Sequence, residues 1–320
     1  MTRFIIRRVL FAVFVTWIIG TVVFILFFIA NPGDIALSFA GKNARPEIVD
    51  LVRQRLGLNR PKIEQYWSFM NGLLHGDLGT SFVNQQPVRE MILSRLPVTA
   101  SLTFGAAFIW LLIGIPIGVL AATKPRSWRD RLATSFALAG LSTPTFVLGL
   151  LLLYLLFYLP TVNGLPLFPG SGYTPLLQDP LDWAHHLILP WLTVALVSAA
   201  TYSRITRGSL LEVLGEDYVR TARAKGMSER SVVYRHGLRS ALTPIVTILG
   251  VDIGVLLGGA IITERIFGLP GIGQVAIRSV TIGDLPVVMG TVLFAAIFIV
   301  VANIFVDIAY ALLDPRVRLS

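Results

Sequence analysis

The sequence contains no cysteine and few charged side chains. With 0 Cys among its 320 residues, a disulfide, a thiolate metal site and a thiol redox centre are all excluded. Charged residues make up 14% of the chain, whereas they are about a quarter of a typical soluble domain. Hydrophobic residues make up 54%, and the mean hydropathy is +0.73. This composition excludes an ordinary soluble domain and predicts an all-α polytopic membrane protein.

Motifs for nucleotide binding and hydrolysis are also missing. No segment fits G-x-x-x-x-G-K-[ST], because Gly41-Lys42 lacks both the first glycine and the following hydroxyl residue. Neither H-E-x-x-H nor G-x-S-x-G occurs. At His185–His186, an interfacial or hydrogen-bonded role is favoured over a metal site. We therefore expect no enzyme activity and no cofactor or metal bound by this chain.

The net charge of +9 would suggest nucleic acid as a partner if the chain were soluble. Here the basic residues flank long apolar runs instead, which is the pattern of the positive-inside rule. The lipid bilayer is the expected partner of these residues, and nucleic acid is not.

Six apolar runs are long enough to cross a bilayer, which takes roughly 20 residues. They cover residues 9–30, 100–122, 132–159, 187–203, 241–263 and 285–306. Six spans place both termini on one side, and most of the 27 Lys and Arg residues fall on that side, so both termini are predicted to be cytoplasmic. The first run is too long for a cleavable signal peptide. Prolines in or at the spans predict kinks at Pro116, Pro144, Pro190, Pro244 and Pro286.

The chain is expected to divide into three parts. Residues 1–30 form an N-terminal tail and the first span, residues 31–98 an extracytoplasmic region, and residues 99–320 a membrane core. The extracytoplasmic region is too long for a simple connector, and helical spacing of apolar residues predicts short helices at 46–56 and 65–74. A packed cap over the spans and a docking surface are equally favoured roles for it.

A charged loop at residues 204–241 separates two apolar spans, and its organising stretch is 211–244. Glu212, Glu216 and Arg220 follow one another at i, i+4, which favours one helix. Gly226 after Lys225 predicts the end of that helix, since glycine adopts the left-handed conformation freely, and Ser228 can cap a second helix. Two short helices in water between spans suit the docking of another protein.

The fifth span holds the candidates for a translocation path. Gly250, Gly254 and Gly258 recur at i+4, where close helix packing is favoured over substrate contact, although small residues also leave room for a path. Asp252 is the one ionisable residue deep in a span, and a pathway role and structural pairing are equally open for it. Glu264 lies near the end of this span, where an interfacial charge is the favoured interpretation.

Eight segments are similar to one known family. They are RFIIRRVL (3–10), NPGD (31–34), LGLNRP (56–61), HGDLGTS (75–81), GIPIGVLAA (114–122), LEVLGEDYVRTARAKG (211–226), ITERIFGLPGIG (262–273) and VDIAYALLDPRVR (306–318). On these segments the sequence resembles the inner-membrane permease subunits of bacterial ABC importers of the dipeptide/oligopeptide/nickel family, in particular their B subunits. The stretch at 211–226 is the most specific of the eight.

The resemblance implies a type I ABC importer permease fold that works in a complex. The implied partners are a second homologous permease, two ATP-binding subunits that bind ATP and Mg, and an extracytoplasmic substrate-binding protein. Residues 221–226 are similar to the "EAA" loop, whose short helix docks on an ATPase subunit. Gly226 and Ala222 match the loop's pattern, while Arg220 and Thr221 stand where it has Glu and Ala. The coupling residues implied are Glu216, Asp217, Tyr218, Arg220, Thr221, Ala222, Arg223, Ala224, Lys225 and Gly226.

Peptides are the leading cargo that the resemblance implies, and nickel chelates and oligosaccharides remain alternatives. Two different classes of function stay open as well. A membrane scaffold would recruit a cytoplasmic partner without transport. A secondary transporter would work alone, although one buried acid is a poor basis for a proton-driven pump.

Overall fold

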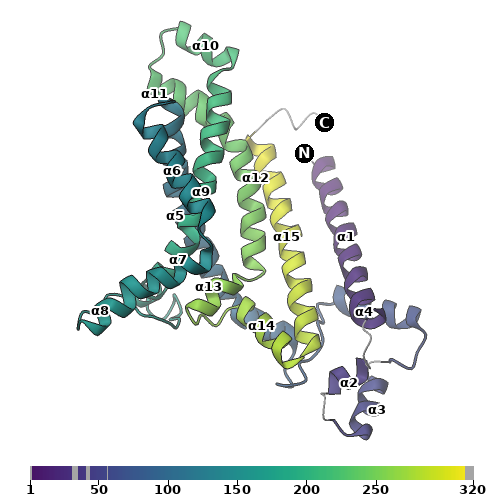
Figure 1. Ribbon diagram of the computed structural model, residues 1–320. Helices are drawn as coiled ribbons and strands as arrows, with labels where there is room; N and C mark the ends of the chain where they lie inside the picture. Colours follow the sequence, from purple (N-terminus) through teal and green to yellow (C-terminus); the bar gives the residue numbers. More distant parts are fainter. Residues whose placement is uncertain (1, 31–34, 41–43, 56, 314–320) are drawn as a thin grey trace.

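The computed structural model describes residues 2–30, 35–40, 44–55 and 57–313, and in these ranges the chain forms helices and no strand (Figure 1). Six helices are long and apolar enough to cross a membrane, and this confirms the predicted number of spans. They cover Ile6–Ile29, Val88–Thr123, Thr145–Val162, Pro180–Leu214, Glu229–Leu257 and Leu285–Val306. The NPGD segment at 31–34 and the end of the closing motif, 314–318, lie outside the described residues.

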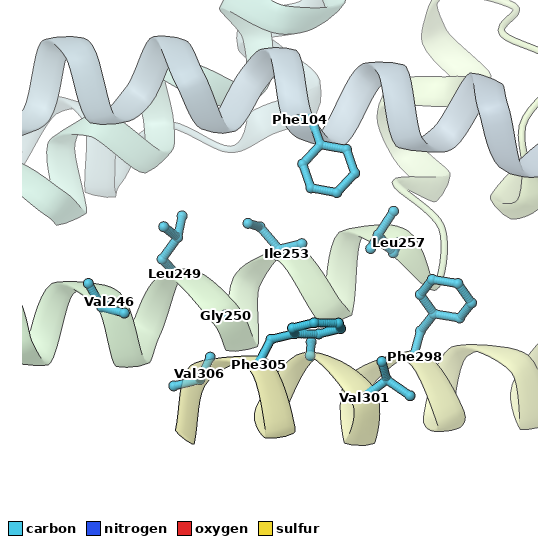
Figure 2. Close-up of a pocket in the computed structure, with 11 residues that line it drawn as sticks. Phe104, Val246, Leu249, Gly250, Ile253, Leu257, Phe298, Val301, Phe305 and Val306 are labelled. Carbon is cyan, nitrogen blue, oxygen red and sulfur yellow. The ribbon is translucent and has the colours of Figure 1, made fainter. Parts of the chain in front are cut away.

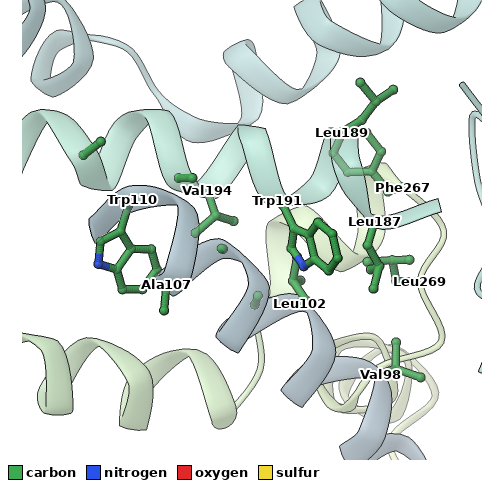
Figure 3. Packing of buried hydrophobic residues seen from close by; sticks show 14 of the residues in the cluster. Val98, Leu102, Ala107, Trp110, Leu187, Leu189, Trp191, Val194, Phe267 and Leu269 are labelled. Atoms are coloured by element: carbon green, nitrogen blue, oxygen red, sulfur yellow. The ribbon is translucent and has the colours of Figure 1, made fainter. Parts of the chain in front are cut away.

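Two helices, α5 (Val88–Thr123) and α9 (Pro180–Leu214), form the centre of the bundle. Both are longer than the apolar runs within them, because charged residues such as Arg89 and Arg207 lie in their outer turns. At Gly114 on α5, an added Cβ would lie 2.9 Å from the Ala199 carbonyl oxygen on α9. Small residues therefore bring these two backbones together, as the G-I-P-I-G motif predicts. Figure 3 shows Trp110 and Trp191 among the apolar side chains that fill the contact.

The third predicted span is wrong as one continuous helix. Residues 132–159 divide between α6 (Trp128–Ser142) and α7 (Thr145–Leu152), which continues through a π-helical turn (Leu153–Tyr158) into α8 (Leu159–Val162). Thr143 is extended at the break, with ψ 116°, because the residue before a proline is disfavoured in the α conformation. Pro116, Pro190 and Pro244 stay inside helices. Pro144 thus ends a helix, and α7 leaves α6 at an angle (Figure 1).

The fifth predicted span ends earlier than expected. α12 (Leu238–Leu257) follows a π-helical segment (Val232–Gly237) and is capped by Gly258. Gly259 then takes φ +130°, a conformation that other residues rarely adopt. The chain continues as two short helices, α13 (Ile261–Ile266) and α14 (Ile272–Ile282), before α15 (Leu285–Leu313). Figure 1 places α13 and α14 at the end of the bundle opposite α10 (Asp217–Ala224).

The segment between α1 (Thr2–Phe24, extended by the π-helical Ile25–Ile29) and α5 forms three helices. They are α2 (Ile35–Ala40), α3 (Pro46–Arg55) and α4 (Lys62–Leu74), so the two helices predicted in this region are confirmed.

This segment is tied to the spans at two places. The Tyr66 hydroxyl on α4 lies 2.8 Å from the Thr21 hydroxyl on α1. Ser81 donates a 2.6 Å hydrogen bond to Asp284, which lies between α14 and α15. The segment therefore packs on the spans, as the interpretation as a cap requires.

Candidate functional site

The predicted docking element stands beyond one end of the bundle. α9 ends at Leu214, and the chain then forms α10, α11 (Glu229–Ser231) and the π-helical segment that leads into α12 (Figure 1). Gly226 follows α10 with φ +77°, so the left-handed stop predicted at this glycine is confirmed. One part of the prediction is wrong: Gly215 caps α9, so Glu212 and Arg220 belong to two helices rather than one.

Only one face of α10 is buried. Val219 and Ala222 pack against Val232 and the end of α9. The other nine residues predicted to couple are exposed, namely Glu216, Asp217, Tyr218, Arg220, Thr221, Arg223, Ala224, Lys225 and Gly226. Ala222 therefore packs against its own chain, and the nine exposed residues are not covered by the described part of the chain.

Two polar contacts fix the orientation of α10. The Arg223 guanidinium donates to both carboxylate oxygens of Glu229, at 2.8 and 3.1 Å, and to the Leu214 carbonyl oxygen at 3.4 Å. The Tyr218 hydroxyl donates to Ser240 at 3.0 Å. These bonds connect α10 to the end of α9, to α11 and to the start of α12. α10 is thus bonded to the ends of both helices, α9 and α12, that enter the bundle on either side of it.

An ion pair joins α6 to α9 at the same end of the bundle. Arg207 donates to the two carboxylate oxygens of Asp130 at 2.6 and 3.0 Å. The backbone N–H of Arg126 donates to the same carboxylate at 2.8 Å. The hydrogen bonds from Arg207 and then from Arg126 hold the pKa of Asp130 below its usual value. The sequence prediction missed this pair, although Ser127-x-x-Asp130 matches a capping box.

The three glycines of α12 face α15 closely. At Gly254 an added Cβ would lie 3.0 Å from the Ala302 Cβ, at Gly258 it would lie 2.7 Å from the Ala295 Cβ, and at Gly250 it would overlap Val306. This geometry is that of close packing. Gly250 also borders an apolar cavity of about 450 Å³ between α5, α12 and α15, which Figure 2 shows with Phe104, Phe298 and Phe305 around it.

Asp252 lies on another face of α12. Two residues turn a helix by roughly 200°, so Asp252 points away from the Gly250 contact and toward α9. There the buried Tyr202 donates its hydroxyl proton to Asp252 Oδ2 at 2.8 Å. The carboxyl itself is only partly buried. The structure thus pairs Asp252 with Tyr202 and does not group it with the three glycines.

Glu264 is not the interfacial charge that its position near a span end suggested. Its side chain is fully buried, and it accepts hydrogen bonds from the Thr99 hydroxyl at 2.7 Å and the Gln274 backbone N–H at 3.0 Å. Thr99 in turn accepts from the Ile272 backbone N–H at 2.9 Å. A Cβ at Gly271 would collide with the Glu264 carboxylate. Residue 271 of the G-L-P-G-I-G segment is therefore a glycine because the Glu264 carboxylate fills the space that a Cβ would occupy.

The sequence matches two connected family descriptions. "Binding-protein-dependent transport system inner membrane component" matches residues 114–319, and the description of the N-terminal part of such membrane components matches residues 1–103. The chain belongs to this family. It is a multi-pass membrane component of a transport system that depends on a binding protein.

Relatives match over nearly the whole chain. A protein of Brucella abortus (strain 2308) with the provisional name of a peptide transport system permease protein is 43% identical over 318 residues, which are 99% of each chain. The glutathione transport system permease protein GsiC of Escherichia coli (strain K12) is 39% identical over 323 residues, again with 99% of each chain covered.

Two solved structures share the fold. The inward-facing MetNI methionine ABC transporter gives a TM-score of 0.53 at 22% identity, covering 70% of this chain and 96% of the other. An amino acid ABC transporter crystallised with histidines gives 0.51 at 20% identity, covering 69% and 93%. At this identity the likeness concerns the fold alone, and it confirms the expected permease fold.

Proposed function

We propose that this chain is one of two permease subunits of an ATP-driven importer, and that the two together form the path for di- and oligopeptides. The family supports the dependence on a binding protein. The names of the two relatives, a peptide and a glutathione permease, support peptides over nickel chelates or oligosaccharides as cargo. The observation that carries the proposal is α10, a rigidly held helix whose exposed face no other part of the described chain covers.

In this proposal α10 docks on an ATP-binding subunit. The contact is formed or supported by ten residues, which are residues 216–226 except Val219. ATP and Mg bind to that partner, since this sequence carries no phosphate-binding loop. When two such subunits close on ATP, α10 moves, and its bonds through Arg223 and Tyr218 pull on α9 and α12. A rocking movement between two packings of the helices then opens the path on alternate sides.

The same proposal fixes the orientation in the membrane. The α10 end is cytoplasmic, because most basic residues lie there, and α1 begins and α15 ends nearer to that end of the bundle (Figure 1). The segment with α2, α3 and α4 is then extracytoplasmic, together with α13 and α14. The binding protein delivers its cargo at this end.

Co-purification with the products of adjoining genes tests the proposal. We expect a stable complex of this chain, a second permease and an ATPase whose hydrolysis rises when loaded binding protein is added. A membrane scaffold would bind a cytoplasmic partner but would give no stimulated hydrolysis. A stand-alone transporter would show uptake that depends on sodium or protons and needs no ATPase.

A further inference from the structure

The Tyr202 side chain is packed tightly against α5, and its hydroxyl contacts Asp252. An added Cβ at Gly114 would lie 2.9 Å from the Tyr202 Cβ, so only a glycine leaves space for this tyrosine. The Trp110 ring packs beside it with 5.7 Å between ring centroids, and Tyr202 is 1% exposed. From this fixed position its hydroxyl donates to Asp252 Oδ2. Residues of α5, α9 and α12 together fix the place of one carboxylate within the spans.

The charge of that carboxylate has no counter-charge in the described part of the chain. Tyr202 is the one hydrogen-bond donor that reaches Asp252 there, and it is a neutral hydroxyl. No lysine, arginine or histidine of the described residues forms an ion pair with Asp252. An ionised carboxylate in a membrane is costly unless it meets water or a cation, and such residues mark substrate pathways. An ionised Asp252 would therefore meet water or a cation from outside the described chain.

Asp252 borders a strip of α12 that the chain leaves open. Thr247, Val251 and Val255 follow one another at i+4 and are exposed, the two valines by 41% and 54%. The remaining faces of α12 contact α15, α5 and α9. Asp252 lies beside this strip and is itself only partly buried, so the uncovered side is the side from which a ligand would reach its carboxylate.

We infer that Asp252 binds the ammonium group of the cargo as the cargo passes α12. This inference rests on the proposed function, because every peptide with an unblocked amino terminus carries such a group. An ammonium–carboxylate contact is a charge-assisted hydrogen bond, which is stronger than a neutral one. Tyr202 occupies one carboxylate oxygen and orients the other, so the site selects for a free amino group over an uncharged group of the same size. A basic side chain of the second permease is the competing source of positive charge.

The test uses the complete complex in proteoliposomes, with ATP inside and loaded binding protein outside. Two radiolabelled probes are compared, each at a concentration that saturates the binding protein: trialanine, and propionyl-dialanine, which lacks the amino group. We expect the wild type to take up trialanine with about tenfold preference, the size of one charge-assisted hydrogen bond. Asp252→Asn should lower that preference to about twofold or less while binding-protein-stimulated ATP hydrolysis persists. Asp252→Glu keeps the charge and should restore most of the preference.

Two results overturn the inference. One is an Asp252→Asn complex that keeps the full preference for trialanine. The other is loss of the second permease from the purified Asp252→Asn complex, which would assign the carboxylate to a cation of that subunit. If the wild-type complex takes up neither probe and its ATP hydrolysis is not stimulated by the binding protein, the proposed function itself is wrong.

Discussion

Arg207 holds Asp130 by two hydrogen bonds across the contact between α9 and α6, 2.6 and 3.0 Å long. The Asp130 side chain is 8% exposed, so this pair is not an ordinary surface ion pair. Arg207 lies two turns before the end of α9, where the helix leads toward α10. The pair therefore braces the part of α9 through which movement of α10 would enter the bundle.

Replacing Asp130 with Asn should uncouple hydrolysis from transport. The amide keeps the shape of the carboxylate, but it cannot accept both bonds from Arg207, and it leaves the half-buried guanidinium without its counter-charge. We expect about a tenfold rise in ATP hydrolysed per peptide imported, because the α6–α9 brace loosens. The measurement is parallel uptake and hydrolysis in proteoliposomes. Asp50→Asn, which removes an exposed i,i+3 pair with Arg53, is the matched control and should behave as wild type. An unchanged ratio in Asp130→Asn would contradict the role of the pair.

The same pair predicts a stability change in acid. The folded pKa of Asp130 is lowered from 3.8, so the pair contributes fully above that value and is lost as the pH falls through the folded pKa. The wild type should therefore lose thermal stability in detergent below about pH 4, by more than Asp130→Asn loses over the same range. Unfolding curves between pH 7 and pH 3 measure this. Parallel slopes for the two proteins would show that Asp130 carries none of the acid sensitivity.

Gly271→Ala should destabilise the protein, because its methyl group would collide with the buried Glu264 carboxylate. Either the carboxylate loses its bonds to Thr99 and Gln274 or the start of α14 moves, at a cost of about 1–3 kcal/mol. Thermal unfolding of the purified complex measures the loss. Gly208→Ala is the control, because Gly208 lies in α9 with open space around its Cα, and helix propensity favours alanine there. Equal melting temperatures for the two variants would contradict the packing described for Gly271.

Gly226→Asp should abolish transport while the protein still inserts in the membrane. Nothing lies within 4 Å of an added Cβ at this glycine, so the chain itself has room for a side chain. The expected effect comes from the loss of glycine at a φ of +77° and from a negative charge at the surface proposed to dock on the ATP-binding subunit. Gly226→Asn isolates the charge, since asparagine and aspartate tolerate this conformation alike and only aspartate is charged, and we expect partial uptake from it. Membrane levels by immunoblot and peptide uptake are the readouts, and normal uptake by the Asp variant would refute the prediction.

Local sequence signals predicted the elements well. Apolar run length identified all six spans, and Lys225-Gly226 identified a helix end, because each signal depends only on neighbouring residues. Helix ends were less predictable. Thr143 before Pro144 broke a run that hydropathy alone treats as continuous, and charged outer turns hid the full length of α5 and α9.

The polar pairs were not predictable for a different reason. Glu264 meets Thr99 across 165 residues of sequence, and Arg207 meets Asp130 across 77. The pattern of residues within one segment does not reveal contacts between residues so far apart in the sequence. A charge near the end of an apolar run is usually interfacial, and Glu264 departs from that rule because Gly271 and the start of α14 make room for it.

The central claim is that energy reaches this chain through α10 from a separate ATPase. Reconstitution in liposomes is its most direct test. The purified chain alone should not concentrate trialanine in liposomes under any ion gradient. The same liposomes should accumulate it when the second permease, the ATP-binding subunits, ATP and the binding protein are all present. Uphill uptake by this chain alone, with no nucleotide-hydrolysing partner, would contradict the account.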